Sequence, residues 1–261
     1  MTLSNRYKIY LPCKVRYALE LGYKGTEYRG WQSQLNGNTV QEELELQLAR
    51  LFQKKTNVLG CGRTDAEVHA SYFVAHFEAE SELPERFLFR LNQMLPPDIA
   101  VYKVIAVRDD FHARFSATYR KYIYKTTFVK NPFRKDEMLF LFKEPNIELM
   151  NLACLELLQH NDFAAFCKSN ADNKTTMCDL MEARWIVNDG CLEFHVKANR
   201  FLRNMVRAMV GTLLDIGNGT TELASLPGIL ASGTRSAGGK SVAAKGLYLV
   251  DVGYNWDEFS K

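Results

Sequence analysis

Hydrophobic residues recur along this chain with two different spacings, and each spacing predicts one kind of element. Alternation of hydrophobic and polar residues is typical of half-buried strands. It predicts strands at residues 14–21, 72–79, 100–108, 119–128, 182–188, 192–197 and 247–252. The pair 182–188 and 192–197 flanks Asp189-Gly190, which predicts a hairpin.

Spacings of three and four residues predict helices with one hydrophobic face. Thr39-Val-Gln-Glu42 has the form of a capping box and predicts a helix over residues 39–53. A second helix is expected to start at Pro84, because proline is favoured in the first turn of a helix. Further helices are expected at residues 148–160, 200–216 and 222–231.

The helix over 200–216 is the longest one expected. Arg200, Arg203 and Arg207 fall at i, i+3 and i+7, so they should share one face of it. Gly211 lies inside the same helix, where glycine costs about 1 kcal/mol against alanine. This position therefore predicts a close approach to a neighbouring element.

The order of these elements predicts an α+β fold with largely antiparallel pairing. The first hundred residues alternate strand and helix, and Asp109-Asp110 is a plausible boundary. The expected division is a tail at 1–13, an α+β subdomain at 14–110, and a second α+β subdomain at 111–261. The two subdomains look like variants of one layout.

Composition is that of a soluble globular protein with a substantial core. The chain has 261 residues, 47% hydrophobic and 24% charged. It contains no apolar run of about 18 residues, and its first ten residues lack the apolar segment of a signal peptide. The six cysteines are scattered without a C-x-x-C pair, and the five histidines show no ligand spacing. We therefore expect a cytoplasmic protein without a metal site.

Positive charge is local rather than global. The net charge is only +3. Residues 119–135 nevertheless hold six Lys or Arg and five aromatic residues without an acid, and residues 197–214 hold four Lys or Arg without an acid. Such patches are typical of surfaces that bind phosphates.

The candidate chemistry lies in residues 60–70. Gly60 and Gly62 lead into Arg63-Thr-Asp65, and glycines before a polar triplet favour a tight loop whose backbone can approach a ligand. From spacing alone, Asp65 is either a turn residue that satisfies backbone amides or a functional carboxylate.

The same stretch resembles the G-R-T-D-x-G-V-H-A signature of the tRNA pseudouridine synthase A family, which modifies the anticodon stem-loop of tRNA. One position differs, because Glu67 stands where the family has glycine. Other segments resemble family motifs in the same order between residues 15 and 252: Y-x-G-x-x-Y-x-G-W-Q at 23–32, F-H-A-R-F-S-A at 111–117, R-x-Y at 120–122, D-F-x-x-F at 162–166, F-L-x-x-M-V-R-x-x-V-G at 201–211 and G-L at 246–247. Trp31, in the first of these, fits a core anchor better than a base-stacking platform.

The resemblance implies two α+β subdomains, each with a largely antiparallel sheet, joined around a central catalytic cleft. The first carries the catalytic loop and the second a basic helix that binds tRNA. Asp65 is then the catalytic nucleophile. Arg207 pairs with it, although a solvated face or a phosphate contact are the alternatives for this arginine. Tyr122 stacks under the uracil and is a candidate general base, with an ordinary strand tyrosine as the alternative.

Substrate contacts follow from the same resemblance. Arg63 helps to displace the base, or clamps a phosphate. Leu247 packs on the uracil face, although Ala243-Ala-Lys245 stands where the family often begins with proline. The tRNA surface is expected to use further cations, each with a solvated position as its alternative: Arg200, Arg203, Lys121, Lys125 and Arg134.

The implied function is conversion of uridines at tRNA positions 38, 39 and 40 to pseudouridine by a homodimer without a cofactor. One alternative is a catalytically impaired RNA-binding paralogue, which Glu67 and the missing proline favour. Another is a hydrolase that uses an Asp nucleophile on a small phosphorylated substrate. The absence of a P-loop and of a metal cluster in the sequence disfavours the hydrolase.

Overall fold

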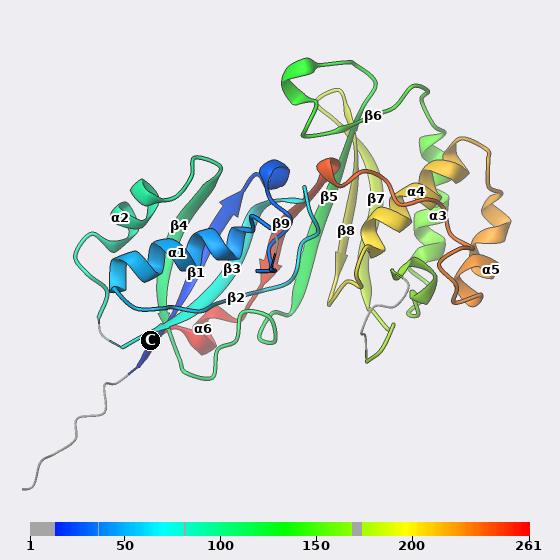
Figure 1. Cartoon of the computed structure of the whole chain (residues 1–261). Coiled ribbons are helices and arrows are strands. Elements are labelled where there is room, and N and C mark those ends of the chain that lie inside the picture. Colours follow the sequence, from blue (N-terminus) through cyan, green and yellow to red (C-terminus); the bar gives the residue numbers. More distant parts are fainter. Residues whose placement is uncertain (1–13, 36, 81, 169–173) are drawn as a thin grey trace, which may run out of the picture.

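A computed structural model describes residues 14–35, 37–80, 82–168 and 174–261. Within these ranges nine strands form one sheet in the order β4-β1-β3-β9-β5-β8-β7, with β2 added to β3 and β6 added to β5 (Figure 1). The strands are β1 (Val15–Tyr23), β2 (Val58–Gly60), β3 (His69–Ala79), β4 (Ile99–Val107), β5 (Tyr119–Thr127), β6 (Leu139–Phe140), β7 (Leu180–Asn188), β8 (Cys191–Ala198) and β9 (Leu247–Gly253). The helices are α1 (Val40–Phe52), α2 (Phe87–Met94), α3 (Ile147–Leu157), α4 (Met205–Gly217), α5 (Leu226–Ala231) and α6 (Trp256–Phe259).

The last strand of the chain joins the two halves of the sheet. β9 pairs in parallel with β3 through His69 with Tyr248 and Ala70 with Leu249, and it pairs antiparallel with β5. All other pairings among the main strands are antiparallel. The α+β class with mostly antiparallel pairing is therefore confirmed, and the strands of both halves continue into a single sheet.

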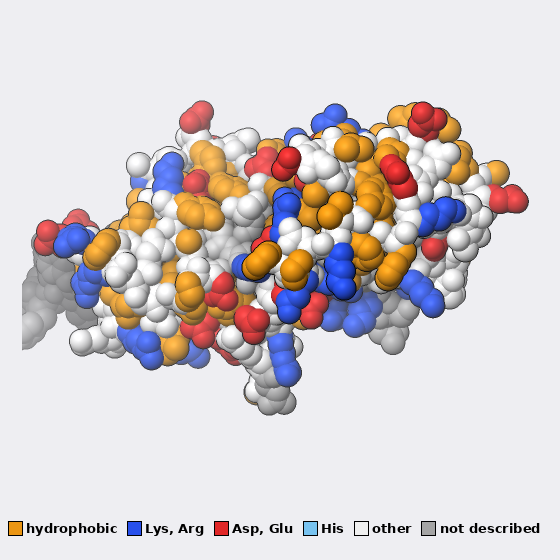
Figure 2. Space-filling model, turned by 90° about the horizontal axis from the view of Figure 1, so that it is seen from above, with side chains coloured by type: hydrophobic (Ala, Val, Ile, Leu, Met, Phe, Trp, Pro, Cys, Tyr) orange, Lys and Arg blue, Asp and Glu red, His pale blue; other side chains and the backbone are white. Residues whose placement is uncertain are grey.

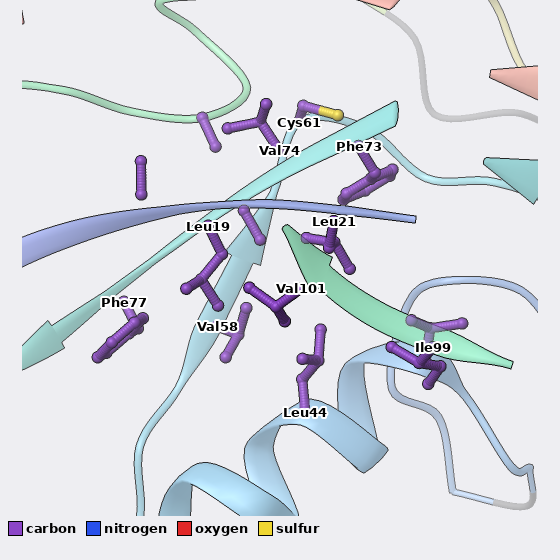
Figure 3. Close-up of a cluster of buried hydrophobic side chains, with 14 of the residues drawn as sticks. Leu19, Leu21, Leu44, Val58, Cys61, Phe73, Val74, Phe77, Ile99 and Val101 are labelled. Atoms are coloured by element: carbon purple, nitrogen blue, oxygen red, sulfur yellow. The ribbon is translucent and has the colours of Figure 1, made fainter. Parts of the chain in front are cut away.

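The first core lies between this sheet and α1 and α2. Leu44 of α1 points toward Leu19 and Val101 of the sheet (Figure 3). Thr39 caps α1 as expected, since its Oγ1 accepts from the Glu42 amide at 3.3 Å. The Glu42 carboxylate accepts from the Thr39 hydroxyl at 3.0 Å, rather than from the Thr39 backbone amide of a full capping box. Trp31 is buried and stacks on Phe73 with ring centroids 4.1 Å apart, as expected of a core anchor.

The second core lies beside β5, β8 and β7, where α3, α4 and α5 pack (Figure 1). Tyr124 and Phe194 are fully buried in it. A Cβ atom on Gly211 of α4 would overlap the carbonyl oxygen of Lys240, so the expected close approach is confirmed. Residues 239–242 run along α4 at this contact, where Val242 N donates to the Arg207 carbonyl at 3.2 Å.

The C-terminal residues also contact the first core. Leu249 and Val252 of β9 belong to it, and Trp256 and Phe259 pack against it. The division into 14–110 and 111–261 thus stays a proposal, and the expected tail at 1–13 lies outside the described residues. None of the described helices is long and apolar enough to cross a membrane.

Three helix starts differ from the prediction, and the simplest case is α5, which begins at Leu226 after a 3-10 turn at Leu223–Ser225 rather than at residue 222. α4 begins at Met205 rather than Arg200, because Asn204 adopts a left-handed conformation with φ 68° and donates to Ser241 Oγ at 2.6 Å. Arg200 and Arg203 therefore lie in the loop before α4 and do not share a helix face with Arg207. Similarly, α2 begins at Phe87, three residues after Pro84, since Arg86 has φ 55°.

Candidate active site

The loop over residues 61–68 connects β2 to β3 and is fixed by hydrogen bonds on both sides of Asp65. Before Asp65, the buried Thr64 bonds through its Oγ1 to the Tyr23 hydroxyl at 2.9 Å, and its carbonyl accepts from the Trp31 amide at 3.3 Å. After Asp65, Val68 N donates to the Asp65 carbonyl at 3.2 Å. The carboxylate is thus presented on a loop whose backbone is anchored in the first core.

Two arginines from the second half face this carboxylate. Arg207 Nη1 lies 3.4 Å from Asp65 Oδ2, and Arg203 Nε lies 4.0 Å from Asp65 Oδ1. Arg207 is also held by its Nε, which donates to the Val242 carbonyl at 2.8 Å. The Arg207 side chain is 23% exposed and the Arg203 side chain 60% exposed. Asp65 and Arg207 therefore form a partly buried ion pair across the junction of the two halves.

Tyr122 of β5 lies in the same environment. Its ring meets the edge of the Phe201 ring with centroids 5.2 Å apart. Burial raises the pKa of the Tyr122 hydroxyl well above its usual value, and the negative charge of Asp65 adds to this effect. Tyr122 is therefore a neutral phenol at physiological pH.

The other two tyrosines of β5 differ from Tyr122 in that their hydroxyls are engaged. The Tyr119 hydroxyl donates to Asp251 Oδ2 at 2.8 Å, and the Tyr124 hydroxyl donates to the Ala243 carbonyl at 2.8 Å. The Tyr122 hydroxyl makes no hydrogen bond to a described residue. Of the three, Tyr122 is thus the tyrosine with a hydroxyl free for a substrate.

Arg120 joins segments that are far apart in the sequence. Its guanidinium donates to the carbonyls of Cys61, Asn199, Ala117 and Arg114, at 2.9, 3.0, 3.2 and 2.5 Å. Cys61 begins the Asp65 loop, and Asn199 precedes the loop with Arg200 and Arg203. One side chain therefore ties together the backbone on several sides of the site.

Positive charge accumulates around Arg114. The pKa of its guanidinium is lowered by partial burial and then by the charges of Arg63, Arg120 and Arg200, which lie close enough to repel it. None of these four arginines forms an ion pair within the described ranges. Like charges without counter-ions destabilise one another, so this cluster is suited to an anionic ligand.

The remaining predicted substrate contacts are placed differently. Lys121 points to the other face of the sheet from Tyr122 and pairs with Glu182 at 2.9 Å. The structure does not bring it to Asp65. Leu247 is 6% exposed, at the start of β9 opposite Tyr124, where it belongs to the second core.

The two other predicted cations also lie away from Asp65. Lys125 lies over the Tyr248 ring, 4.8 Å from its centroid, and Arg134 pairs with Glu137 at 3.7 Å. Both line a hollow of about 620 Å³, together with His69 and Lys24. Asp65 and Arg207 do not line it. Figure 2 shows one face of the molecule from above, and Lys and Arg side chains lie among hydrophobic ones near its middle.

His69 is the first residue of β3, directly after the Asp65 loop, and its side chain lines that hollow. Its Nδ1 accepts from the Gly25 amide at 3.0 Å, and its Nε2 faces the carbonyls of Asp136 and Lys245 at 3.1 and 3.0 Å. These partners require a neutral ring with the proton on Nε2. Burial lowers the pKa of His69, which favours the same neutral form.

At both positions where the chain differs from the family motifs, the backbone conformation can be compared with the one that the family residue would adopt. Glu67 has φ 65°, a left-handed conformation that glycine adopts without strain. The loop keeps its turn there, since Glu67 N donates to the Tyr28 carbonyl at 3.2 Å. Ala243 has φ −56°, close to the value that proline would impose. At each position this chain adopts the conformation that the family residue favours.

Arg114 and Phe201 have no role predicted from the sequence, and Arg120 enters there only as part of the R-x-Y segment at 120–122. Arg114 lies in the F-H-A-R-F-S-A segment, and Phe201 opens the motif that contains Arg207. The motifs contained these residues, but only the fold brings the four carbonyls to Arg120.

Comparisons with known proteins identify the family. A family model described as tRNA pseudouridine synthase matches residues 22–116 and 153–255. The tRNA pseudouridine synthase A of Azobacteroides pseudotrichonymphae genomovar. CFP2 is 44% identical over 244 residues, which are 92% of this chain and 98% of that protein. The protein of the same name from Bacteroides fragilis is 44% identical over 247 residues, 94% of this chain and 98% of that protein. The one from Chromobacterium violaceum is 38% identical over 250 residues, 94% of this chain and 95% of that protein. With matches of this extent, and with the motif residues Asp65, Tyr122 and Arg207 gathered at one site, the chain belongs to the tRNA pseudouridine synthase family.

Proposed function

We propose that this protein is an isomerase that converts uridines at positions 38, 39 and 40 of the tRNA anticodon stem-loop to pseudouridine. The observation that carries the proposal is the pairing of Asp65 with Arg207 beside Tyr122, within a cluster of arginines. A lone carboxylate surrounded by cations suits a reaction at the sugar or base of an anionic polymer.

The reaction rearranges one nucleoside without an external reagent. The bond between uracil N1 and ribose C1′ breaks, and a bond between C5 and the same C1′ forms. The proton leaves C5 and a proton is taken up at N1, so the product is an isomer of the substrate. Asp65 acts as the nucleophile or stabilises the separated sugar, and Arg207 holds its carboxylate in position.

Tyr122 and its neighbours hold the base. Tyr122 stacks under the uracil, and because its raised pKa keeps it neutral it accepts the C5 proton only if its own proton has left. Arg63 occupies the space that the extruded uridine leaves, or clamps a phosphate. Leu247 packs on the other side of the uracil.

The arginines around Asp65 bind the RNA backbone. Arg200 and Arg203 lie in the loop before α4, where Arg200 lies near Arg114 and Arg203 near Asp65, so they can follow a single strand into the site. Contacts of this kind release counter-ions, and tRNA binding should therefore weaken steeply with salt. In keeping with the family resemblance, we also propose a cytoplasmic homodimer whose cleft is shared by both subunits, which light scattering after gel filtration tests.

The decisive experiment measures tritium release from unmodified tRNA labelled at uracil C5. Wild-type protein is expected to release tritium. The isosteric variant Asp65→Asn is expected to release none above background while it binds tRNA with a Kd within threefold of wild type. Binding without release by the wild type would favour the impaired RNA-binding paralogue, and release by Asp65→Asn would remove Asp65 from the mechanism. The arrangement of Asp65, Tyr122 and Arg207 supports the active enzyme over that paralogue.

A further inference from the structure

Phe115 is an aromatic side chain exposed next to the arginine cluster. Its side chain is 74% exposed, whereas Phe111 and Ala113, shortly before it in the chain, are fully buried. The Arg114 guanidinium lies 5.6 Å from its ring centroid. The proposed function gives Phe115 no role and includes Arg114 only as a member of the arginine cluster.

The turn that carries Phe115 is held by local hydrogen bonds and ring contacts. His112 N donates to Ser116 Oγ at 3.0 Å, Ser116 N donates to the His112 carbonyl at 2.8 Å, and Arg114 N donates to His112 Nδ1 at 3.1 Å. The His112 ring packs against Phe115 with centroids 4.4 Å apart, and the buried His76 ring packs against His112 at 4.9 Å. An exposed ring supported in this way loses little conformational entropy when a ligand covers it.

The turn is also fixed to the Asp65 loop. Arg120 Nη2 donates both to the Arg114 carbonyl and to the Cys61 carbonyl, so these two backbone groups meet at one nitrogen. Arg63, two residues after Cys61, lies near enough to Arg114 to lower the pKa of its guanidinium. Phe115 and Arg114 therefore lie at the edge of the site, next to Cys61, where the Asp65 loop begins.

We propose that Phe115 and Arg114 form a stacking subsite for one unpaired nucleotide of the tRNA that flanks the target uridine, with the base on the Phe115 ring and its phosphate at Arg114. The proposal rests on the function proposed above and adds a second point at which the RNA strand is held.

The chemistry of the subsite selects a nucleotide over another protein. A protein partner would have to bury Arg114, Arg63 and Arg200, which have no counter-ion among the described residues. A nucleotide supplies both complements, a π-face for the ring and a negative charge for the guanidinium. Extrusion of the uridine leaves its neighbour unstacked on one side, and that neighbour gains a new stacking partner on Phe115.

The test compares Kd values for tRNA over a range of salt concentrations. Phe115→Ala is expected to weaken binding about tenfold at every salt concentration without changing the slope of log K against log salt, because stacking releases no counter-ions. Phe115→Trp is expected to restore affinity. Arg114→Ala is expected to reduce that slope by about 1, as the loss of one phosphate contact does.

Phe89 of α2 provides the matched control. It is 53% exposed and has a cation of its own, since the Arg86 guanidinium lies 4.5 Å from its ring centroid. Phe89→Ala is expected to leave Kd unchanged, and thermal unfolding of all variants is expected to match wild type. A Kd of Phe115→Ala within twofold of wild type, or no rescue by Phe115→Trp, overturns the subsite.

The outcome separates this inference from the proposed function. If the wild type releases no tritium but Phe115→Ala still weakens tRNA binding with an unchanged salt slope, the subsite stands and the proposed activity fails. If the wild type releases tritium and Phe115→Ala binds as tightly as wild type, the activity stands and the subsite fails.

Discussion

Asp65 is held by two guanidinium groups that differ in how firmly they are placed. Arg207 is fixed from behind by the Val242 carbonyl, so its position does not depend on Asp65. Arg203 is 60% exposed and reaches the carboxylate only at 4.0 Å. Exposed pairs of the second kind contribute little, whereas a fixed and partly buried guanidinium determines the orientation of its partner.

Arg207→Lys should therefore impair chemistry more than binding. A lysine ammonium cannot keep both the Val242 carbonyl and Asp65 as a guanidinium fork does. We expect kcat to fall roughly 100-fold with KM changed less than threefold, as measured by tritium release at several tRNA concentrations. Arg203→Lys is the matched control, with a loss of kcat below about threefold. Equal losses in both variants would contradict the unequal roles.

Glu67→Gly should stabilise the protein. A left-handed conformation costs a non-glycine residue about 1–2 kcal/mol, and part of the gain is offset by the larger entropy of glycine in the unfolded chain. The net increase in the free energy of unfolding is expected to be about 0.5–1 kcal/mol, measured by urea denaturation. Glu67→Ala keeps the strain and should show no gain; a gain of the same size there would assign the effect to the glutamate side chain instead.

At the scale of elements, local patterns predicted what local contacts determine. The Thr39 cap places the start of α1, because its partners Thr39 and Glu42 are three residues apart. Asp189 and Gly190 both have positive φ, 48° and 70°, as a tight hairpin between β7 and β8 requires. The start of α4 was mispredicted because Asn204 is held by Ser241, a residue that lies far along the chain.

In the site, too, local motifs predicted some features, and contacts between distant segments determine the others. Motifs placed Asp65, Tyr122 and Arg207 in the sequence, but the alternation of β5 turns Lys121 away from them, and no local pattern reveals the four carbonyls around Arg120. Short strands such as β2 exist only because a longer neighbour, β3, provides their hydrogen bonds. Contacts between distant segments, which determine these features, leave no periodic trace in a single sequence.

Gly211→Ala tests the contact between α4 and the segment that orients Arg207. Alanine is the better helix former, yet its Cβ would overlap the Lys240 carbonyl and displace the backbone near Val242. We expect the free energy of unfolding to fall by about 1–3 kcal/mol, with a loss of kcat. Gly228→Ala in α5 is the control, because nothing lies within 4 Å of the added Cβ; it should stabilise by up to about 1 kcal/mol. Similar changes in the free energy of unfolding for Gly211→Ala and Gly228→Ala would mean that residues 239–242 move to accommodate the added Cβ at no measurable cost.

At the scale of the whole molecule, a buried histidine joins the sheet to the segment that leads into the second half. His76 of β3 is 3% exposed, and its Nδ1 accepts from the Ala113 amide at 3.1 Å. Burial lowers the pKa of His76 from 6.5 to about 4, and the charges of His112 and Arg16 act in the same direction. The imidazole is therefore neutral in the folded protein at pH values where it is protonated in the unfolded chain.

Stability should consequently fall in mild acid. Because the folded pKa lies below the unfolded one, the contribution of His76 is present above pH 6.5 and is lost as the pH falls from 6.5 to about 4. This loss is on the order of 2–3 kcal/mol, measured by urea denaturation across that range. His76→Asn keeps an acceptor for Ala113 but does not titrate, so the difference between the two pH profiles isolates His76 from the other histidines. Parallel profiles would show that the pKa of His76 is not lowered on folding.

The position of β9 has a consequence for how the protein is made. A growing chain leaves the ribosome with its N-terminus first, so early segments can begin to fold before later ones have been synthesised. Asp65 is synthesised early and its partner Arg207 late, yet the strand that seats them side by side is supplied by residues 247–253. The two halves are therefore not aligned until residues 247–253 have been synthesised, and a chain that lacks β9 would keep Arg203 and Arg207 without the strand that places them beside Asp65.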